Sequence, residues 1–265
     1  MQPFLSMSSG TFTFFNGLTA QVLQVQDRTE LPKGLHQIGL NTRQPVLVLV
    51  GGASNLALDD QNRLENLFID VLAPLANQLG LTVIDGGTDA GIMQLIGRAR
   101  AAIQGKFPLV GVAPVGKVQL PDQQMEVSQH QNSQHHSSQH HSLEPHHTHF
   151  VLVPGEHWGD ESPWIAEIAS YVAQSAPSVT ILINGGAVAS KDARESVAEQ
   201  RLVVVIAGTG RLADRIAKAA QQPQTEAQDA WLVKSGYFQL FNLANVESEL
   251  KPFLQQHFTY NGATL

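Results

Sequence analysis

Glycine turns follow four short apolar runs of the chain, and the backbone of such turns can bind an anion. The turns are Gly51-Gly52 after 46–50, Gly86-Gly87 after 81–85, Gly185-Gly186 after 179–184 and Gly208-Thr209-Gly210 after 202–207. A strand that runs through a glycine turn into a helix leaves backbone N–H groups unpaired. Together with the helix dipole, these groups favour a phosphate or carboxylate. Any one of the turns could equally be a plain strand–helix connection without a ligand.

The repetition of the turn makes a ligand site the stronger interpretation. If the four apolar runs are parallel strands of one sheet, all four turns lie at its carboxyl edge, where open α/β sheets bind ligands. We therefore expect a nucleotide-like or other phosphate-bearing ligand there rather than an empty cleft. Arg211, directly after the fourth turn, adds a guanidinium fork suited to phosphate.

The segment 154–161 carries the most varied chemical groups of any expected loop. It follows a predicted strand and contains Glu156, His157, Trp158, Asp160 and Glu161. Trp158 could stack on a base or pack beneath the loop. Glu161 could accept a hydrogen bond from a ribose hydroxyl, as acids do in dinucleotide-binding folds, or cap a helix.

Composition excludes several classes of protein. The 265 residues carry a net charge of −7 and a pI of about 5.8, which argues against a general nucleic-acid or membrane-surface binder. Without cysteine, the chain has no disulfide, zinc–thiolate site or cysteine nucleophile. The longest apolar runs have the length of strands, so we expect no membrane insertion. The beginning of the chain does not resemble a secretory signal, and we expect a cytoplasmic protein.

Apolar runs that alternate with helical patterns predict an α/β fold, a Rossmann-like three-layer sandwich with a mainly parallel sheet. We expect residues 46–258 to form this domain and strands within 1–45 to pack on it, as a hairpin around Asn16-Gly17. Helices are expected at 59–79, ended by Gly80, at 90–104, near 227–233 and at 245–256. Thr88 or Asp89 could cap the second of these. Another helix is expected after 161, with Ser162 as N-cap, Pro163 as its first residue and a buried face formed by Ile165, Ile168, Ala169 and Val172. Further strands are expected at 108–113, 145–153 and 237–243.

A stretch rich in Gln, His and Ser interrupts this pattern at 117–146, and we expect it to be a disordered insertion. Eight histidines lie from His130 to His149. Histidine is a common metal ligand, but low-complexity histidines are often incidental. Because no carboxylate or thiol framework at fixed spacing accompanies them, we expect no metal site, and no other feature predicts a cofactor.

Five blocks of the chain together resemble the N-terminal cytosolic region of melastatin-type (TRPM) cation channels, a branch of the SLOG superfamily. The blocks are Val50-Gly-Gly-Ala-Ser-Asn55; Asp85-Gly-Gly-Thr-Asp-Ala-Gly-Ile-Met93; Val110-Gly-Val-Ala-Pro-Val-Gly116; His147-Thr-His-Phe-Val-Leu-Val153 with Trp158-Gly-Asp-Glu161; and Ile183-Asn-Gly-Gly186 with Ala207-Gly-Thr-Gly-Arg-Leu-Ala-Asp214. They cover roughly 45–220 in the same order as in the family. The chain looks like the prokaryotic stand-alone (LSDAT-type) form of that domain.

The resemblance implies a sensor domain for a nucleotide-derived small molecule, such as ADP-ribose, cyclic ADP-ribose or a related NAD derivative. By the match, the pocket would be lined by Gly51, Gly52, Ala53, Gly86, Gly87, Thr88, Gly91, Glu161, Gly185, Gly186, Gly208, Gly210 and Arg211. The channel family usually has an arginine where this chain has Ile165. Arg194, Arg201 or Arg211 could replace its contact with a phosphate.

A second resemblance implies an enzyme. The block 86–93 is also similar to the glycine block of Lonely Guy phosphoribohydrolases, which are lysine-decarboxylase-like proteins that cleave a nucleotide's N-glycosidic bond. Their Pro-Gly-Gly-x-Gly-Thr-x-x-Glu block corresponds here to Asn184-Gly-Gly-Ala-Val-Ala-Ser-Lys-Asp192, which lacks the Gly-Thr pair and shortens the acid. If the chain were such an enzyme, Asp192 and Glu161 would be the catalytic carboxylates. We expect binding without catalysis.

A third alternative is an interaction module without a ligand, in which the last predicted strand forms a partner surface instead of completing the sheet. A sensor of this kind also implies an effector protein, which no residue identifies. A homo-oligomer is compatible with the fold and is indicated by no particular residue.

Overall fold

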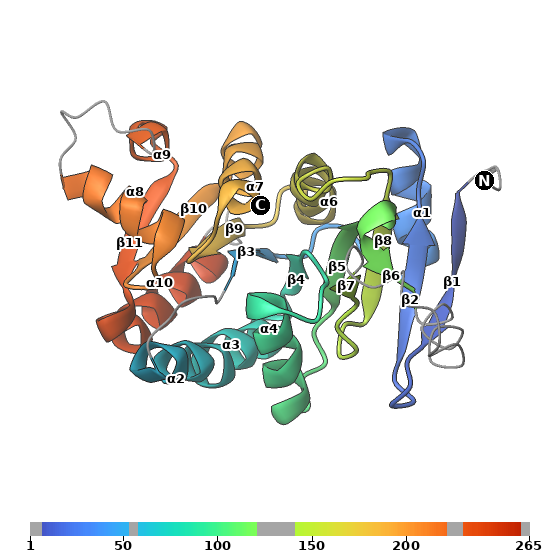
Figure 1. Ribbon diagram of the computed structural model, residues 1–265, viewed down its shortest axis with the longest axis horizontal. Helices are drawn as coiled ribbons and strands as arrows, with labels where there is room; N and C mark the ends of the chain where they lie inside the picture. The colour runs from blue at the N-terminus through green and yellow to red at the C-terminus, as the bar shows by residue number, and fades with distance from the viewer. Residues whose placement is uncertain (1–6, 53–57, 121–140, 222–229, 261–265) are drawn as a thin grey trace, which may run out of the picture.

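The computed structural model describes residues 7–52, 58–120, 141–221 and 230–260, and these fold around one nine-stranded sheet (Figure 1). In spatial order the strands are β1 (Ser8–Thr13), β2 (Thr19–Gln24), β8 (His149–Val153), β5 (Leu109–Pro114), β4 (Thr82–Asp85), β3 (Val46–Gly51), β9 (Ser178–Ile183), β10 (Leu202–Ala207) and β11 (Phe238–Asn242). Eight strands run parallel, and β1 is antiparallel at one edge. This confirms the predicted α/β class and its mainly parallel sheet.

Helices cover both faces of the sheet, which makes three layers (Figure 1). One face carries α1 (Leu31–Gln37), α6 (Ser162–Ala173), α7 (Ala187–Ala198), α8 (Arg211–Gln221) and α9 (Ala230–Lys234). The other carries α2 (Leu58–Asn66), α3 (Ala73–Leu79), α4 (Gly91–Ala102) and α10 (Val246–Tyr260). Strands covered on both faces are apolar throughout, which is why the central runs of the sequence show no alternation.

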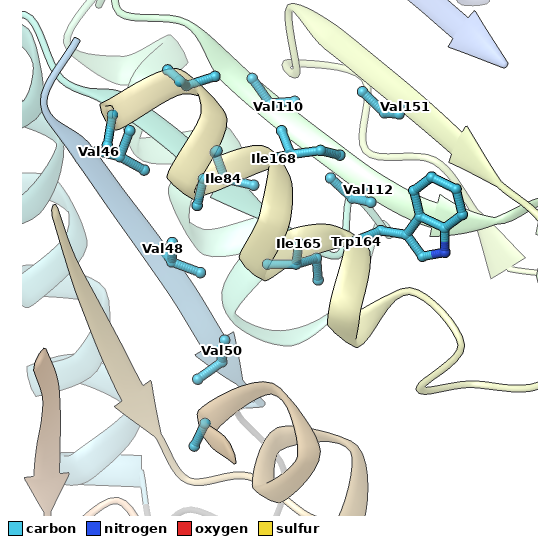
Figure 2. Close-up of a cluster of buried hydrophobic side chains, with 14 of the residues drawn as sticks. Val46, Val48, Val50, Ile84, Val110, Val112, Val151, Trp164, Ile165 and Ile168 are labelled. Atoms are coloured by element: carbon cyan, nitrogen blue, oxygen red, sulfur yellow. The ribbon is translucent and has the colours of Figure 1, made fainter. Parts of the chain in front are cut away.

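Helix α6 packs directly over the middle of the sheet (Figure 2). Ile165 and Ile168 point from the helix toward valines of β3 and β5, and both isoleucines are at most 4% exposed. The predicted buried stripe of this helix is therefore confirmed. Its first turn differs from the prediction, because Glu161 is the N-cap and Ser162 is already helical.

The expected helix over 59–79 is present and contains an irregularity. A π-helical turn, Leu67–Leu72, joins α2 to α3. Gly80 ends the run in the left-handed conformation, with φ of 63°, as its position in the sequence predicts. The next helix, α4, has Ala90 as N-cap, so the predicted cap at Thr88 or Asp89 is wrong.

The N-terminal hairpin extends the sheet. β1 pairs antiparallel with β2, and β2 pairs parallel with β8. Of the expected insertion at 117–146, residues 121–140 lie outside the described residues, whereas its two ends form the short parallel pair β6 (Val118–Gln119) and β7 (His141–Ser142). The strand expected over 145–153 begins at His149. In the described part of the chain, no helix is both long and apolar enough to cross a membrane.

The chain order of the strands determines where a ligand site can form. From β3 the chain continues outward through β4, β5 and β8, then returns to the other side of β3 and continues through β9, β10 and β11. The connections that leave β3 and β9 therefore diverge. Such a switch point opens a crevice beyond the carboxyl ends of the two strands.

Candidate functional site

A cavity of about 220 Å³ lies at the carboxyl ends of β3 and β4, beside the switch point. The loop after β4, the first turns of α4, α6 and α7, and the loop 154–161 enclose it. Its lining residues are Leu49, Val50, Gly51, Gly86, Thr88, Ala90, Met93, His141, Trp158, Glu161, Ile165, Val188 and Asp192. Most of these side chains are apolar, so the cavity suits a flat or aliphatic group with a few polar contacts.

Trp158 supplies the aromatic wall of the cavity. Its indole meets the His141 imidazole edge to face, with ring centroids 5.2 Å apart and an interplanar angle of 81°. His141 begins β7 and Trp158 lies in the loop 154–161, so two segments that are separate in sequence meet at the cavity. An indole face in such a position can stack on a heterocyclic base.

Glu161 contributes a carboxyl group fixed by its own turn. Its Oε2 accepts a hydrogen bond from the Gly159 N–H at 2.7 Å, and the residue is 4% exposed. Lys191 Nζ donates to the Gly159 carbonyl oxygen at 2.5 Å, which ties this turn to α7. Burial raises the pKa of Glu161 above its ordinary value.

Asp192 lies one helical turn after Val188 on α7 and also lines the cavity. It is 7% exposed, and its Oδ1 has no hydrogen-bond partner among the described residues. The pKa of this carboxyl is raised to about 7, mainly by burial. The Ser162 hydroxyl lowers this pKa, and the Glu161 carboxylate raises it. A buried acceptor without a partner costs free energy unless a ligand donates to it.

Two glycines of the turns are required by close backbone packing. Gly51 has φ of 131°, and a Cβ there would overlap with the carbonyl oxygen of Ile183 on β9. Gly87 has φ of 68°, and a Cβ there would lie 2.8 Å from the Gly111 Cα on β5. Both turns therefore approach neighbouring strands at distances that only glycine allows.

The turns after β9 and β10 are joined by side-chain hydrogen bonds. Asn184 donates from its backbone N–H to Thr209 Oγ1 at 2.7 Å and from Nδ2 to the Thr209 carbonyl at 2.5 Å. The guanidinium of Arg211 lies over Gly186, whose added Cβ would be 2.7 Å from Nη2. The Gly208 N–H donates to Asp214 Oδ1 at 2.6 Å, so this carboxylate already occupies the place expected for an anion.

The structure divides the predicted ligand-binding residues into two groups. Gly51, Gly86, Thr88 and Glu161 line the cavity, together with Asp192. The remaining predicted residues do not line it: Gly52, Gly87, Gly91, Gly185, Gly186, Gly208, Gly210 and Arg211. Ala53 lies outside the described residues. Gly185, Gly186 and Arg211 lie at the start of α7 and α8, next to Val188 of the cavity wall.

Two of the three arginines considered as phosphate ligands are engaged elsewhere. Arg201 precedes β10, at the end of the sheet opposite the glycine turns, and donates from Nη2 to the Ala166 carbonyl at 3.0 Å. Arg194 stacks on the Trp231 ring at 4.1 Å. Of the three, Arg211 is the one whose guanidinium lies at a glycine turn, over Gly186.

Several lining residues could not be selected from the sequence. Leu49 and Val50 belong to a strand that the sequence predicts only as part of the sheet, and His141 lies in the stretch expected to be disordered. Ile165, noted only as a departure from the channel family, also contacts the cavity. Across 7–52, 58–120, 141–221 and 230–260, no cluster of three or more His, Cys, Asp or Glu residues could hold a metal ion.

Comparisons with known proteins agree with this architecture. A family model described as "SLOG in TRPM, prokaryote" matches residues 44–251. The chain is 24% identical over 213 residues to the mouse (Mus musculus) "Transient receptor potential cation channel subfamily M member 2" and 23% identical over the same length to the rat (Rattus norvegicus) protein. In each case the match covers 71% of this chain and 14% of the relative, so the chain spans a small part of those channels.

Proposed function

The chain belongs to the prokaryotic family of SLOG domains in TRPM, and from this premise we propose that its cavity binds a nucleotide-derived small molecule, such as ADP-ribose or another NAD derivative. The observation that carries the proposal is the cavity at the switch point of a doubly wound sheet. It combines an indole, Trp158, with a buried acceptor that has no partner in the described structure, Asp192 Oδ1. Stacking on a base and donation from a ribose hydroxyl would satisfy both groups.

The size of the cavity indicates that only part of such a ligand would lie inside it. At about 220 Å³ it is smaller than the roughly 300–1,000 Å³ typical of small-molecule sites. It would hold a base and ribose, with the phosphates outside. The start of α7 and the Arg211 guanidinium over Gly186 lie beside it and offer backbone N–H groups and a positive charge.

Ligand contacts to Trp158 and Val188 would add to the hydrogen bond by which Lys191 already holds the loop 154–161 to α7. Binding would then alter the surface that these two segments expose, which an effector protein could recognise. This is the sense in which we propose a sensor rather than a carrier or a structural domain.

A thermal-shift panel tests the proposal. Purified protein is heated with NAD, ADP-ribose, cyclic ADP-ribose, AMP and inorganic phosphate, and each incubation is analysed by chromatography. A ligand at about 100 times its dissociation constant adds roughly 2.7 kcal/mol to the free energy of unfolding. Stabilisation with the ligand recovered intact supports the sensor. The absence of any shift with a nucleotide contradicts it.

The pair of buried carboxyls favours a second candidate, an N-glycosidic hydrolase. Glu161 and Asp192 both line the cavity, and the raised pKa of Asp192, about 7, suits a general acid at neutral pH. Release of a free base in the same chromatography would support this activity. Asp192→Asn would then abolish release while retaining ligand binding.

A further inference from the structure

A buried histidine lies behind the cavity wall. The His147 side chain is fully buried between two buried carboxylates, with Nε2 2.9 Å from Asp85 Oδ1 and Nδ1 2.8 Å from Glu144 Oε2. An ionised carboxylate accepts hydrogen bonds and donates none. Both ring nitrogens can therefore donate only when the imidazole is protonated.

Asp85 and Glu144 also form hydrogen bonds with the backbone of the glycine turn. Asp85 Oδ1 also accepts from the Gly87 N–H at 2.7 Å, and the Glu144 N–H donates to the Gly87 carbonyl at 3.0 Å. The segment 141–144 then runs along the turn, where the Asp89 backbone N–H donates to the Ser142 carbonyl at 2.8 Å. The histidine thus lies at the junction of β4, its glycine turn and the returning segment.

That junction forms part of the cavity wall. Gly86 and Thr88 line the cavity from the glycine turn, and His141 lines it from the returning segment, where it meets Trp158. Helix α4 leaves room for the junction at Gly97, where a Cβ would overlap with the Glu144 carboxylate. His147 itself does not line the cavity.

We propose that His147 is a positioning residue: by bridging Asp85 and Glu144 it fixes the segment 141–149 against the turn 86–88 and so gives the cavity wall its shape. The effect on ligand affinity rests on the proposed function, whereas the effect on the wall does not.

The charges around His147 determine how this bridge depends on pH. Burial alone would lower the pKa of His147, but the Asp85 and Glu144 carboxylates outweigh it and raise that pKa to about 9. His146 Nδ1 lies 2.6 Å from Glu144 Oε1, and the Arg100 guanidinium on α4 interacts electrostatically with the same carboxylate. Because the pKa is raised from 6.5, the contribution to stability is complete below about pH 6.5 and is lost as the pH rises through about 9.

Hydrogen exchange at neutral pH tests the proposal without a ligand. His147→Asn should raise amide exchange in 86–90 and 141–146 by about tenfold or more, because those segments lose their common support. His149→Gln is the matched control, since His149 is a neighbouring imidazole that bonds to the Ile38 carbonyl at 3.0 Å on a different side. Equal exchange of 86–90 in the two variants, or wild-type protection in His147→Asn, would overturn the proposal.

A second variant keeps the test decisive if His147→Asn does not fold. In Glu144→Gln the amide oxygen takes the place of Oε2, where it still accepts from the His146 N–H and from His147 Nδ1, but one of the two charges that raise the pKa of His147 is removed. The wild type should lose thermal stability between about pH 6.5 and pH 9, and Glu144→Gln should lose less over this range, because only Asp85 still raises the pKa of His147. Parallel profiles for the two proteins would contradict the bridge.

Ligand titration separates this proposal from the proposed function. If the wild type binds ADP-ribose, His147→Asn should weaken that binding about tenfold, the scale on which residues remote from a ligand act. Unchanged affinity would contradict the positioning role. If the wild type binds no nucleotide, the proposed function fails, and the exchange experiment alone decides whether His147 shapes the wall.

Discussion

Gly51 at the end of β3 lies against the carbonyl oxygen of Ile183 at the end of β9, so closely that any side chain at position 51 would overlap with it. The contact joins the two strands at which the chain changes direction through the sheet. It therefore fixes the edge beside the cavity, which Gly51 also lines.

Gly51→Ala should destabilise the fold. The substitution adds a clash with backbone and places Ala at φ of 131°, and we expect a loss on the order of 3 kcal/mol in the free energy of unfolding. Denaturant unfolding measures it. Gly10→Ala is the control, because a Cβ at this exposed position of β1 meets nothing within 4 Å. Equal midpoints for the two variants would refute the role of the contact.

Trp158→Ala should weaken nucleotide binding. Stacking of a base on an aromatic side chain is worth about 1–3 kcal/mol, which corresponds to a roughly 5- to 150-fold loss in affinity. Calorimetric titration with ADP-ribose gives the dissociation constants. Trp231→Ala removes an indole that stacks on Arg194 and does not line the cavity, so its affinity should match the wild type. A Trp158 variant that binds as tightly as this control would exclude stacking.

Gly186→Ala should discriminate between ligands with and without phosphate. The new methyl group would displace the Arg211 guanidinium, which lies 2.7 Å from its position. We expect AMP to bind about tenfold more weakly and adenosine to bind as before, since a charge-assisted contact contributes roughly 1.5–3 kcal/mol. Adenosine is thus the internal control. Equal losses for both ligands would mean that the phosphate lies elsewhere.

Asp192→Asn should change the pH dependence of stability. The pKa of Asp192 is raised from 3.8 to about 7, so its favourable neutral form is lost as the pH rises through about 7. The wild type should lose stability between about pH 4 and pH 7, and the variant should lose less. Such a shift is worth on the order of 4 kcal/mol across this range, whereas the amide of the variant does not titrate and contributes equally at every pH. Melting temperatures across this pH range provide the measurement, and superimposable curves would contradict the burial of the carboxyl.

The sheet could be predicted from the sequence because its central strands are continuous apolar runs that end in glycine. Val46 to Val50 are all at most 2% exposed, which such a run requires. Glu161 could also be identified, because an acid just after a strand and before a helix must lie at the carboxyl edge. By the same reasoning, Arg201 is excluded from the cavity, because the residue before a parallel strand lies at the opposite edge of the sheet.

The far wall of the cavity could not be predicted. His141 follows a stretch without apolar periodicity, and its position depends on backbone bonds such as Asp89 N–H to the Ser142 carbonyl. His147 bridges to Asp85 across 62 positions of sequence, and no spacing rule connects the two. Ile165 replaces an expected polar residue, and its contact with the cavity follows only from the way α6 packs on β3.

The location of the ligand is the central claim, and amide hydrogen exchange with and without ADP-ribose tests it most directly. Bound ligand should protect the segments that line the cavity, namely 86–93, 158–165 and 187–192, and should leave the hairpin of β1 and β2 unchanged. No protection at a concentration that saturates the thermal shift, or protection confined to segments outside this set, would contradict the account.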